Sequence, residues 1–108
     1  MNTGDIILVP FPFAELTNKK VRPAVVVCET RDKYQDIVVC AVSSIVPELL
    51  SENELLLHAN QISKLRVDSV LKIDRIVTVK NRDVIAVIGK LETDSLVTFI
   101  EKFKRLVD

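Results

Sequence analysis

The chain has 108 residues, of which 48% are apolar and 28% charged, with a formal net charge of zero and two cysteines. This length supports one hydrophobic core, and two cysteines are too few for a disulfide-built scaffold. We therefore predict a single domain over residues 1–108, with Cys28 and Cys40 reduced and buried, or else joined in one bridge. No apolar stretch approaches the roughly 18 residues of a membrane span, and no signal-peptide pattern is present, so we expect a cytoplasmic protein with no membrane partner.

Positive charge is concentrated locally, although the whole chain is neutral. The stretch 64–82 holds six basic side chains and two acidic ones, whereas every charge in 45–60 is acidic. A nucleic-acid partner would have to use this local basic stretch, and the alternative is that it forms a solvated rim of the fold.

Valine and isoleucine make up a quarter of the chain, which favours β-strands. The first predicted strand covers 5–9 and is ended by Pro10 and Pro12, because proline cannot donate to a strand ladder. A turn over 15–20 then leads into an antiparallel strand over 22–28. These two strands are predicted to form a hairpin.

The middle of the chain predicts further short strands. Residues 36–43 are apolar almost throughout, which indicates a strand covered on both faces. A loop at 47–53 leads to an edge strand at 54–58 and then to a polar stretch at 59–66.

The last third predicts three strands and a helix. The strands cover 69–73, 75–79 and 84–91, with a turn at 81–83 and a bulge at Gly89. Apolar residues then recur at helical spacing: Leu96, Phe99, Ile100, Phe103 and Leu106. The sequence thus predicts a mainly β protein whose sheet is capped by a C-terminal amphipathic α-helix.

The inventory of reactive side chains argues against several enzyme classes. The cysteines and the single histidine, His58, lie at no metal-ligand spacing, and two glycines cannot build a phosphate-binding loop. No glycine-flanked serine accompanies His58, as a serine hydrolase would require. We therefore expect no metal and no cofactor. The remaining arginines, lysines, aspartates and hydroxyls suit anion recognition and phosphoryl chemistry.

Arg22 stands at the start of an apolar strand, directly after a turn that carries two lysines. Pro23 biases Arg22 away from helical conformations, so its guanidinium extends from a stiff, extended backbone. Either this side chain binds an anion, or it caps the strand end in a salt bridge to Glu15 or Asp5.

Four segments occur in a characteristic order: GDIILVPFPF (4–13), KVRPAVVV (20–27), AVSS (41–44) and DSVLKIDRIVT (68–78). In this order they resemble the MazF/PemK toxins of bacterial toxin-antitoxin pairs, over almost the whole chain. The resemblance implies the fold of the CcdB/Kid/MazF/PemK-like toxins, a small SH3-like antiparallel barrel with a C-terminal helix.

The resemblance also implies a metal-independent, sequence-specific endoribonuclease that cuts single-stranded RNA, usually mRNA. In such enzymes the ribose 2′-hydroxyl attacks the adjacent phosphorus and leaves a cyclic phosphate and a 5′-hydroxyl. Arg22 matches the family's arginine after the first loop, which implies phosphate binding and transition-state stabilisation. Ser43 falls where one branch of the family has a threonine that contacts the phosphate, and Ser44 is the alternative in a shifted alignment.

A second branch, which includes PemK and Kid, uses an arginine and an aspartate two residues apart as acid and base. Lys72 and Asp74 match that pair, and positions two apart on a strand share a face. Lysine lacks the planar fork of arginine, which weakens the case for a general acid here. The alternative for Asp74 is a salt bridge to Lys72 or Arg75.

Further RNA contacts are expected around these positions. The loop before the KVRP segment is short and lacks the family's glycine and histidine, so Lys19 and Lys20 would hold the RNA backbone instead. The basic stretch adds Lys64, Arg66 and Arg75 as RNA-binding candidates.

Aromatic side chains that could stack on bases are few: Phe11, Phe13 and Tyr34. For at least one of the two phenylalanines, a place in the core is the stronger expectation.

The same resemblance implies a homodimer and a cognate antitoxin whose acidic C-terminal tail covers the RNA groove. Two other functions stay open. A CcdB-like gyrase poison would need an exposed apolar tip on the terminal helix, whereas Phe99 and Phe103 are assigned to the core. A catalytically weak interaction domain is suggested by Ser43, Lys72 and the short first loop.

Overall fold

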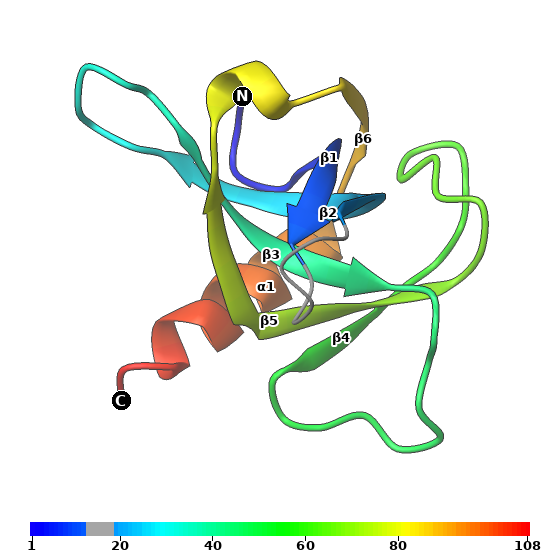
Figure 1. The fold of residues 1–108 in the computed structure, drawn as a ribbon. Helices are drawn as coiled ribbons and strands as arrows, with labels where there is room; N and C mark the ends of the chain where they lie inside the picture. The colour runs from blue at the N-terminus through cyan, green and yellow to red at the C-terminus, as the bar shows by residue number, and fades with distance from the viewer. Residues whose placement is uncertain (13–18) are drawn as a thin grey trace.

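The computed structural model describes residues 1–12 and 19–108, which form one curled antiparallel sheet and a C-terminal helix (Figure 1). The described part of the sheet has six strands in the order β4-β5-β3-β2-β1-β6. Their bounds are Asp5–Pro12 for β1, Lys19–Glu29 for β2, Ile37–Ser43 for β3, Glu54–Leu57 for β4, Ser69–Val79 for β5 and Ala86–Lys90 for β6. A 3-10 helix, η1, covers Asn81–Asp83, and the helix α1 covers Thr93–Arg105. The predicted class, mainly β with a terminal helix, is confirmed.

One face of the sheet is covered by α1, which lies behind β3 and β5 in Figure 1. The predicted apolar stripe of the helix packs against this face, and Phe99 at its centre is 1% exposed. The strands contribute alternating side chains, such as Val25 from β2 and Leu71 from β5. We call this cluster the helix-side core.

The opposite face carries a second apolar cluster, and no α-helix of the described residues covers it. Its buried members come mainly from β1, β2 and β3: Ile7, Val9, Phe11, Ala24, Val26, Ile37, Val39 and Val79. Adjacent residues of β3 therefore belong to different cores, with Val39 in this cluster and Cys40 in the helix-side core. The prediction of a third strand covered on both faces is confirmed, and so is a core position for Phe11.

The strand β1 continues through both prolines that we expected to end it. Pro10 pairs with Val21, and Pro12 pairs with Lys19. The neighbouring β6 pairs with β1 only as far as Leu8, so beyond that residue β2 is the one described strand beside β1. A strand that is open on one side tolerates residues without an N–H. The predicted turn at 15–20 and Phe13 lie outside the described residues, apart from Lys19 and Lys20 in β2.

The strand β5 is continuous, whereas the sequence predicted two strands. Its register shifts where Ala41 pairs with Lys72 and the adjacent Cys40 pairs with Ile76. Three extra residues, 73–75, bulge from the β5 side of this ladder. Asp74 and Arg75 interrupt the apolar pattern inside this bulge, and the sequence therefore predicts two strands where the structure has one.

The loop 58–68 reaches from β4 back to β6 at the other edge of the sheet. The backbone N–H of Lys90 donates to the carbonyl of Ile62 at 3.1 Å. A Cβ at position 89 would lie 2.6 Å from that same carbonyl oxygen, so only glycine permits this approach. The β1–β6 register also shifts beside Gly89, as the sequence predicted.

The two cysteines differ in exposure, and both are free thiols. Cys40 is buried, and burial, together with the charge of Asp74, raises the pKa of its thiol to about 12. Cys28 is exposed, contrary to our expectation, because the β2–β3 register shifts between Val26 and Cys28. In the part of the chain that the structure describes, no helix is long and apolar enough to cross a membrane.

Candidate functional site

The polar candidates gather on the helix-free face, at the end of the sheet beyond the second core. Arg22 lies two positions before Ala24 on β2, and Ser43 lies two positions after Ala41 on β3. Ala24 pairs with Ala41, and Ala41 also pairs with Lys72. Because side chains alternate along a strand and paired residues share a face, Arg22, Ser43 and Lys72 all belong to the helix-free face.

Arg22 is exposed and pairs with Val9 of β1, while the hydrogen-bonded pairing of β2 with β3 ends at Ala24. Arg22 lies two residues beyond this last pair on β2, and Ser43 lies two residues beyond it on β3. The strands separate at this point, and Ser43 accepts a hydrogen bond from the backbone N–H of Ile45 through its Oγ at 3.2 Å. Arg22 and Ser43 thus both lie just past the paired part of β2 and β3.

A cavity of about 550 Å³ has Arg22 in its lining and lies on the helix side of these strands, because Val42 and Leu65 of the helix-side core also line it. Its lining combines three cationic residues and two serines with apolar residues: Leu8, Val21, Arg22, Pro23, Val42, Ser44, Lys64, Leu65, Arg66, Val67, Ser69 and Ile88. None of these described lining residues is acidic. Such a concave site, with an apolar floor and a cationic rim, suits an anionic ligand.

The loop that carries Lys64 and Arg66 is held in shape by its own polar side chains. Asn60 accepts hydrogen bonds from the backbone N–H groups of Ile62 and Ser63 through Oδ1, both at 2.9 Å. At the base of the loop, Asp68 accepts a hydrogen bond from the N–H of Ala59 at 2.8 Å. That bond, with a smaller contribution from His58, lowers the pKa of Asp68. The two cations of the cavity rim therefore stand on an ordered loop.

Lys72 has an acidic partner that the sequence analysis did not identify. Its Nζ lies 3.8 Å from Oε2 of Glu54, the residue directly opposite it on β4. Glu54 also accepts a hydrogen bond from the backbone N–H of Ser51 at 2.7 Å, and this bond, more than the charge of Lys72, lowers the pKa of Glu54. Only the β4–β5 register, which the sequence pattern does not specify, reveals this pair.

Asp74 stands apart from Lys72 because it lies inside the β5 bulge, where simple alternation fails. Its carboxylate accepts a hydrogen bond from Nδ2 of Asn53 at 3.5 Å. Among the described residues, neither Lys72 nor Arg75 forms an ion pair with it. The geometry therefore brings Lys72 to Glu54, and Asp74 to Asn53.

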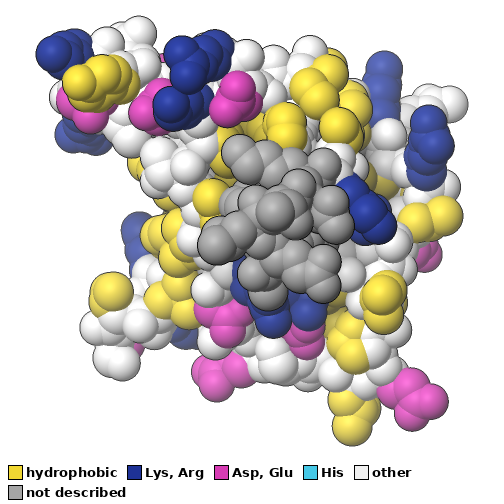
Figure 2. Space-filling model, viewed as in Figure 1, with side chains coloured by type: hydrophobic (Ala, Val, Ile, Leu, Met, Phe, Trp, Pro, Cys, Tyr) yellow, Lys and Arg dark blue, Asp and Glu magenta, His cyan; other side chains and the backbone are white. Residues whose placement is uncertain are grey.

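The remaining candidates lie around this region. Lys20, Ser44 and Arg75 are exposed, and the backbone of Lys19 pairs with Pro12. Figure 2 shows Lys and Arg side chains at several places on the face it presents, some of them beside Asp and Glu side chains. Within residues 1–12 and 19–108, no three acidic, histidine or cysteine side chains gather as a metal site would require.

Comparison with known proteins adds family information to this geometry. The family model described as a PemK-like, MazF-like toxin of type II toxin-antitoxin systems matches residues 2–107. Among 39 matching solved chains is the Mycobacterium tuberculosis toxin MazF-mt6, with a TM-score of 0.68, 18% identity and 96% of each chain covered. No curated protein sequence matches. At this identity, the structural likeness supports the fold alone.

Proposed function

Because the chain belongs to the family of PemK-like, MazF-like toxins of type II toxin-antitoxin systems, we propose that it is a sequence-specific endoribonuclease that cuts single-stranded RNA, above all mRNA, in the cytoplasm. Toxins of this family are generally endoribonucleases. The observation that carries the proposal is the cavity lined by Arg22, Lys64 and Arg66 together with Ser44, whose described lining contains no acidic residue.

The proposed reaction uses a nucleophile from the substrate and needs no metal. The ribose 2′-oxygen forms a bond to the adjacent phosphorus while the bond from phosphorus to the 5′-oxygen breaks. A base takes the proton of the 2′-hydroxyl, and an acid donates a proton to the departing 5′-oxygen. The products are a 2′,3′-cyclic phosphate and a 5′-hydroxyl.

Arg22 and Ser43 would act on the phosphate. A guanidinium remains charged and can bind two phosphate oxygens at once, so Arg22 is suited to the charge that develops on the phosphorane. The Oγ of Ser43 can donate to a third oxygen, with Ser44 as the neighbouring alternative. Lys64 and Arg66, together with Lys19, Lys20 and Arg75, would bind flanking phosphates.

Proton transfer is assigned to carboxylates and amines on β4 and β5. Asp74 is the base and Lys72 the acid if the pattern of the PemK branch holds. Lys72 forms an ion pair with Glu54 at 3.8 Å, which favours an electrostatic role for Lys72.

The partners follow from the same family. We propose that residues 1–108 form one toxin domain, that two copies assemble as a homodimer, and that a cognate antitoxin inhibits it. An acidic C-terminal tail on that antitoxin would compete with RNA for the cationic rim of the cavity.

The test is incubation of the purified protein with a long single-stranded RNA in EDTA. Cleavage is expected, and it should disappear in Arg22→Ala while the circular dichroism spectrum stays unchanged. Inhibition of gyrase supercoiling without RNA cleavage would instead favour a CcdB-like poison. Intact RNA with no effect on gyrase would favour a catalytically weak interaction domain, for which the engagement of Lys72 by Glu54 is the motivating observation.

A further inference from the structure

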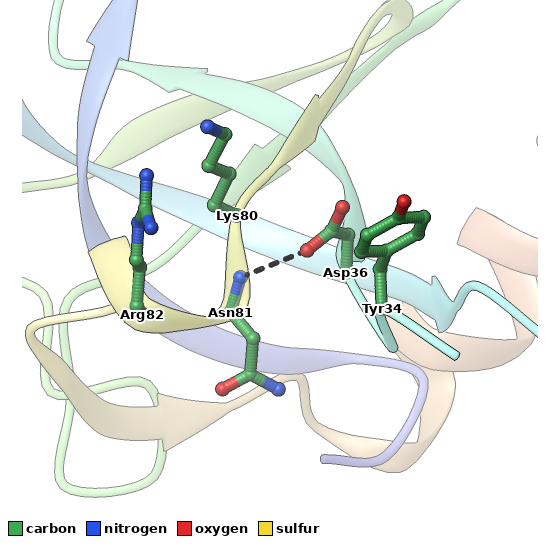
Figure 3. A pocket seen from close by; sticks show the side chains of 5 residues that line it. All are labelled: Tyr34, Asp36, Lys80, Asn81 and Arg82. Atoms are coloured by element: carbon green, nitrogen blue, oxygen red, sulfur yellow. Dashed lines mark hydrogen bonds between the residues drawn. The ribbon is translucent and has the colours of Figure 1, made fainter. Parts of the chain in front are cut away.

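A second cavity, of about 570 Å³, lies at the opposite end of β3 from Ser43 (Figure 3). Five residues line it: Tyr34, Asp36, Lys80, Asn81 and Arg82. Asp36 directly precedes β3 and Ser43 ends that strand, so at about 3.3 Å per residue the two are about 23 Å apart along the sheet. The function proposed above makes no use of this site, which we call the Tyr34 cavity.

Two segments far apart in the sequence build the Tyr34 cavity and are joined by hydrogen bonds. Asp36 accepts a hydrogen bond from the backbone N–H of Asn81 through Oδ1 at 3.3 Å. The Nδ2 of Asn81 donates to the carbonyl of Gln35 at 3.1 Å. Figure 3 shows the side chains of Lys80 and Arg82 on the same side as Asp36 and Tyr34, while the Asn81 side chain points away. In this view Asp36 lies between the two cations and the aromatic ring, and all four side chains line one cavity.

The ring of Tyr34 is 64% exposed, whereas Phe11 and Phe99 are buried. The Nζ of Lys33 lies 5.1 Å from the ring centroid. An exposed ring does not contribute the stability that a buried ring would, but it provides a surface on which a nucleobase can stack. Every base can stack in this way.

We propose that the Tyr34 cavity binds one nucleotide of a single-stranded RNA outside the cleavage site, with its base on Tyr34 and its phosphate between Lys80 and Arg82. The proposal rests on the proposed function, because that function makes RNA the ligand. Small barrels hold single strands of about 4 to 16 nucleotides, so one strand can extend from the cleavage site to this cavity.

Asp36 favours a nucleotide over an acidic peptide and suggests which base it carries. Its Oδ2 can accept a hydrogen bond from an exocyclic amino group, which cytosine, adenine and guanine have and uracil lacks. An acidic peptide would instead bring carboxylates toward Asp36 and make little use of the ring. We therefore expect cytosine to bind more tightly than uracil, although both rings have the same size.

Tyr34 provides its own assay because the chain has one tyrosine and no tryptophan. Its fluorescence should be quenched, to saturation, by an oligocytidylate of about 12 nucleotides with 2′-O-methyl riboses, which cannot be cleaved. Oligouridylate should require a several-fold higher concentration. A parallel titration of free tyrosine amide corrects for absorbance by the RNA.

Paired variants separate the cavity from general charge. The double variant K80A/R82A should raise the half-saturating concentration about tenfold, and it should lower the slope of log affinity against log salt by about 0.7, as expected for one phosphate. The matched control K104A/R105A removes two exposed cations from the last turn of α1 and should change either value little. In anisotropy measurements with labelled RNA, Tyr34→Phe should retain binding and Tyr34→Leu should weaken it.

Several results would overturn the proposal. These are the absence of saturable quenching, equal effects of the two double variants, and displacement of the RNA by a polyglutamate peptide as effectively as by unlabelled RNA. The proposed function is tested separately, because Arg22→Ala should strongly slow cleavage, whereas RNA at a saturating concentration should still quench Tyr34 in this variant. RNA cleavage without quenching would remove this subsite and keep the nuclease.

Discussion

The two faces of the sheet use their side chains differently. The helix-side core is apolar throughout, and Phe99 fills its centre under α1. The helix-free face is apolar only at the end where β1, β2 and β3 form the second core. At its other end, the same alternation presents Arg22, Ser43 and Lys72. The helix-free face thus combines a smaller core with polar groups, while the cavity lined by Arg22, Lys64 and Arg66 opens at the edge of the helix-side core.

This comparison shows how a domain of this size holds a polar site. The buried apolar residues beside the site fix the backbone from which the polar residues extend. Ala24 is in the last pair of the β2–β3 ladder, and Val42 and Leu71 pack in the helix-side core. Changes on the helix side should therefore affect folding, and changes at the polar end should affect RNA cleavage.

The largest expected effect is on the helix side. Phe99→Ala should lower the free energy of unfolding by about 3–5 kcal/mol, because it removes a fully buried ring and leaves a cavity. Val97→Ala, on the same helix but with a side chain that is 52% exposed, should change it by less than about 0.5 kcal/mol. Urea denaturation measures both, and equal losses would contradict the assignment of faces.

The next effect is on the polar end. Arg22→Ala should reduce the rate of RNA cleavage about 10²–10³-fold, as expected when a group that stabilises transition-state charge is lost. Arg22→Lys should restore part of the rate, since it keeps the charge without the planar fork. The control is Arg105→Ala, at the exposed end of α1, which should cleave at nearly the wild-type rate. A similar loss of cleavage rate in Arg105→Ala would show that cleavage depends on the total positive charge of the protein and not on the position of Arg22.

A smaller effect is expected where loop 58–68 contacts β6. Gly89→Ala should destabilise the fold by about 1–3 kcal/mol, because the added methyl group meets the backbone carbonyls of Ile62 and Ser63, which cannot turn aside. The displaced loop carries Lys64 and Arg66, so RNA affinity should fall as well. Denaturation and RNA binding measured on the same preparation test this link, and a loss of stability with unchanged affinity would break it.

The smallest effect concerns Glu54. Its pKa is below the ordinary value of 4.5, so the folded state favours the carboxylate, and this stabilisation is present above about pH 4.5 and lost as the pH falls through the folded-state pKa. Glu54→Gln should therefore be less stable than wild type near neutral pH and equally stable in acid. Because the N–H of Ser51 contributes more than Lys72, Lys72→Met should keep most of this pH dependence. Denaturation midpoints of the wild type and of both variants, measured across the pH range, separate the contribution of the Ser51 N–H from that of the Lys72 charge.

Much of the fold could be predicted from local patterns. The spacing of Leu96, Phe99 and Phe103 specifies the helix and its buried face, and the unbroken apolar run at 36–43 specifies a strand with cover on both sides. The ends of β1 and the continuity of β5 could not be predicted. Where β1 ends depends on the absence of β6 beside Pro10, and the continuity of β5 depends on a register shift at residues 73–75. Both features are set by how the strands pair in the folded sheet.

Of the candidate site, only the residues marked by their local sequence could be predicted, and contacts that depend on strand pairing could not. Arg22 is marked by its own neighbours, because Pro23 and the strand that follows it are visible in the sequence. The pair of Lys72 with Glu54 depends on how β4 aligns with β5, and the hollow between Tyr34 and Arg82 depends on how η1 packs against the β2–β3 connection. Contacts of this kind follow from the assembled sheet and have no local signature.

The measurement that tests the central claim most directly is the chemistry of the cut ends. A long single-stranded RNA is incubated with the protein in EDTA, beside the same sequence made with 2′-deoxyribose, and the fragments are analysed by mass spectrometry. We expect the RNA alone to be cut, with 2′,3′-cyclic phosphates and 5′-hydroxyls at the new ends. Cleavage of the deoxy strand, or 5′-phosphate ends on the RNA fragments, would show that the attacking oxygen is not the substrate's 2′-hydroxyl and would contradict the account.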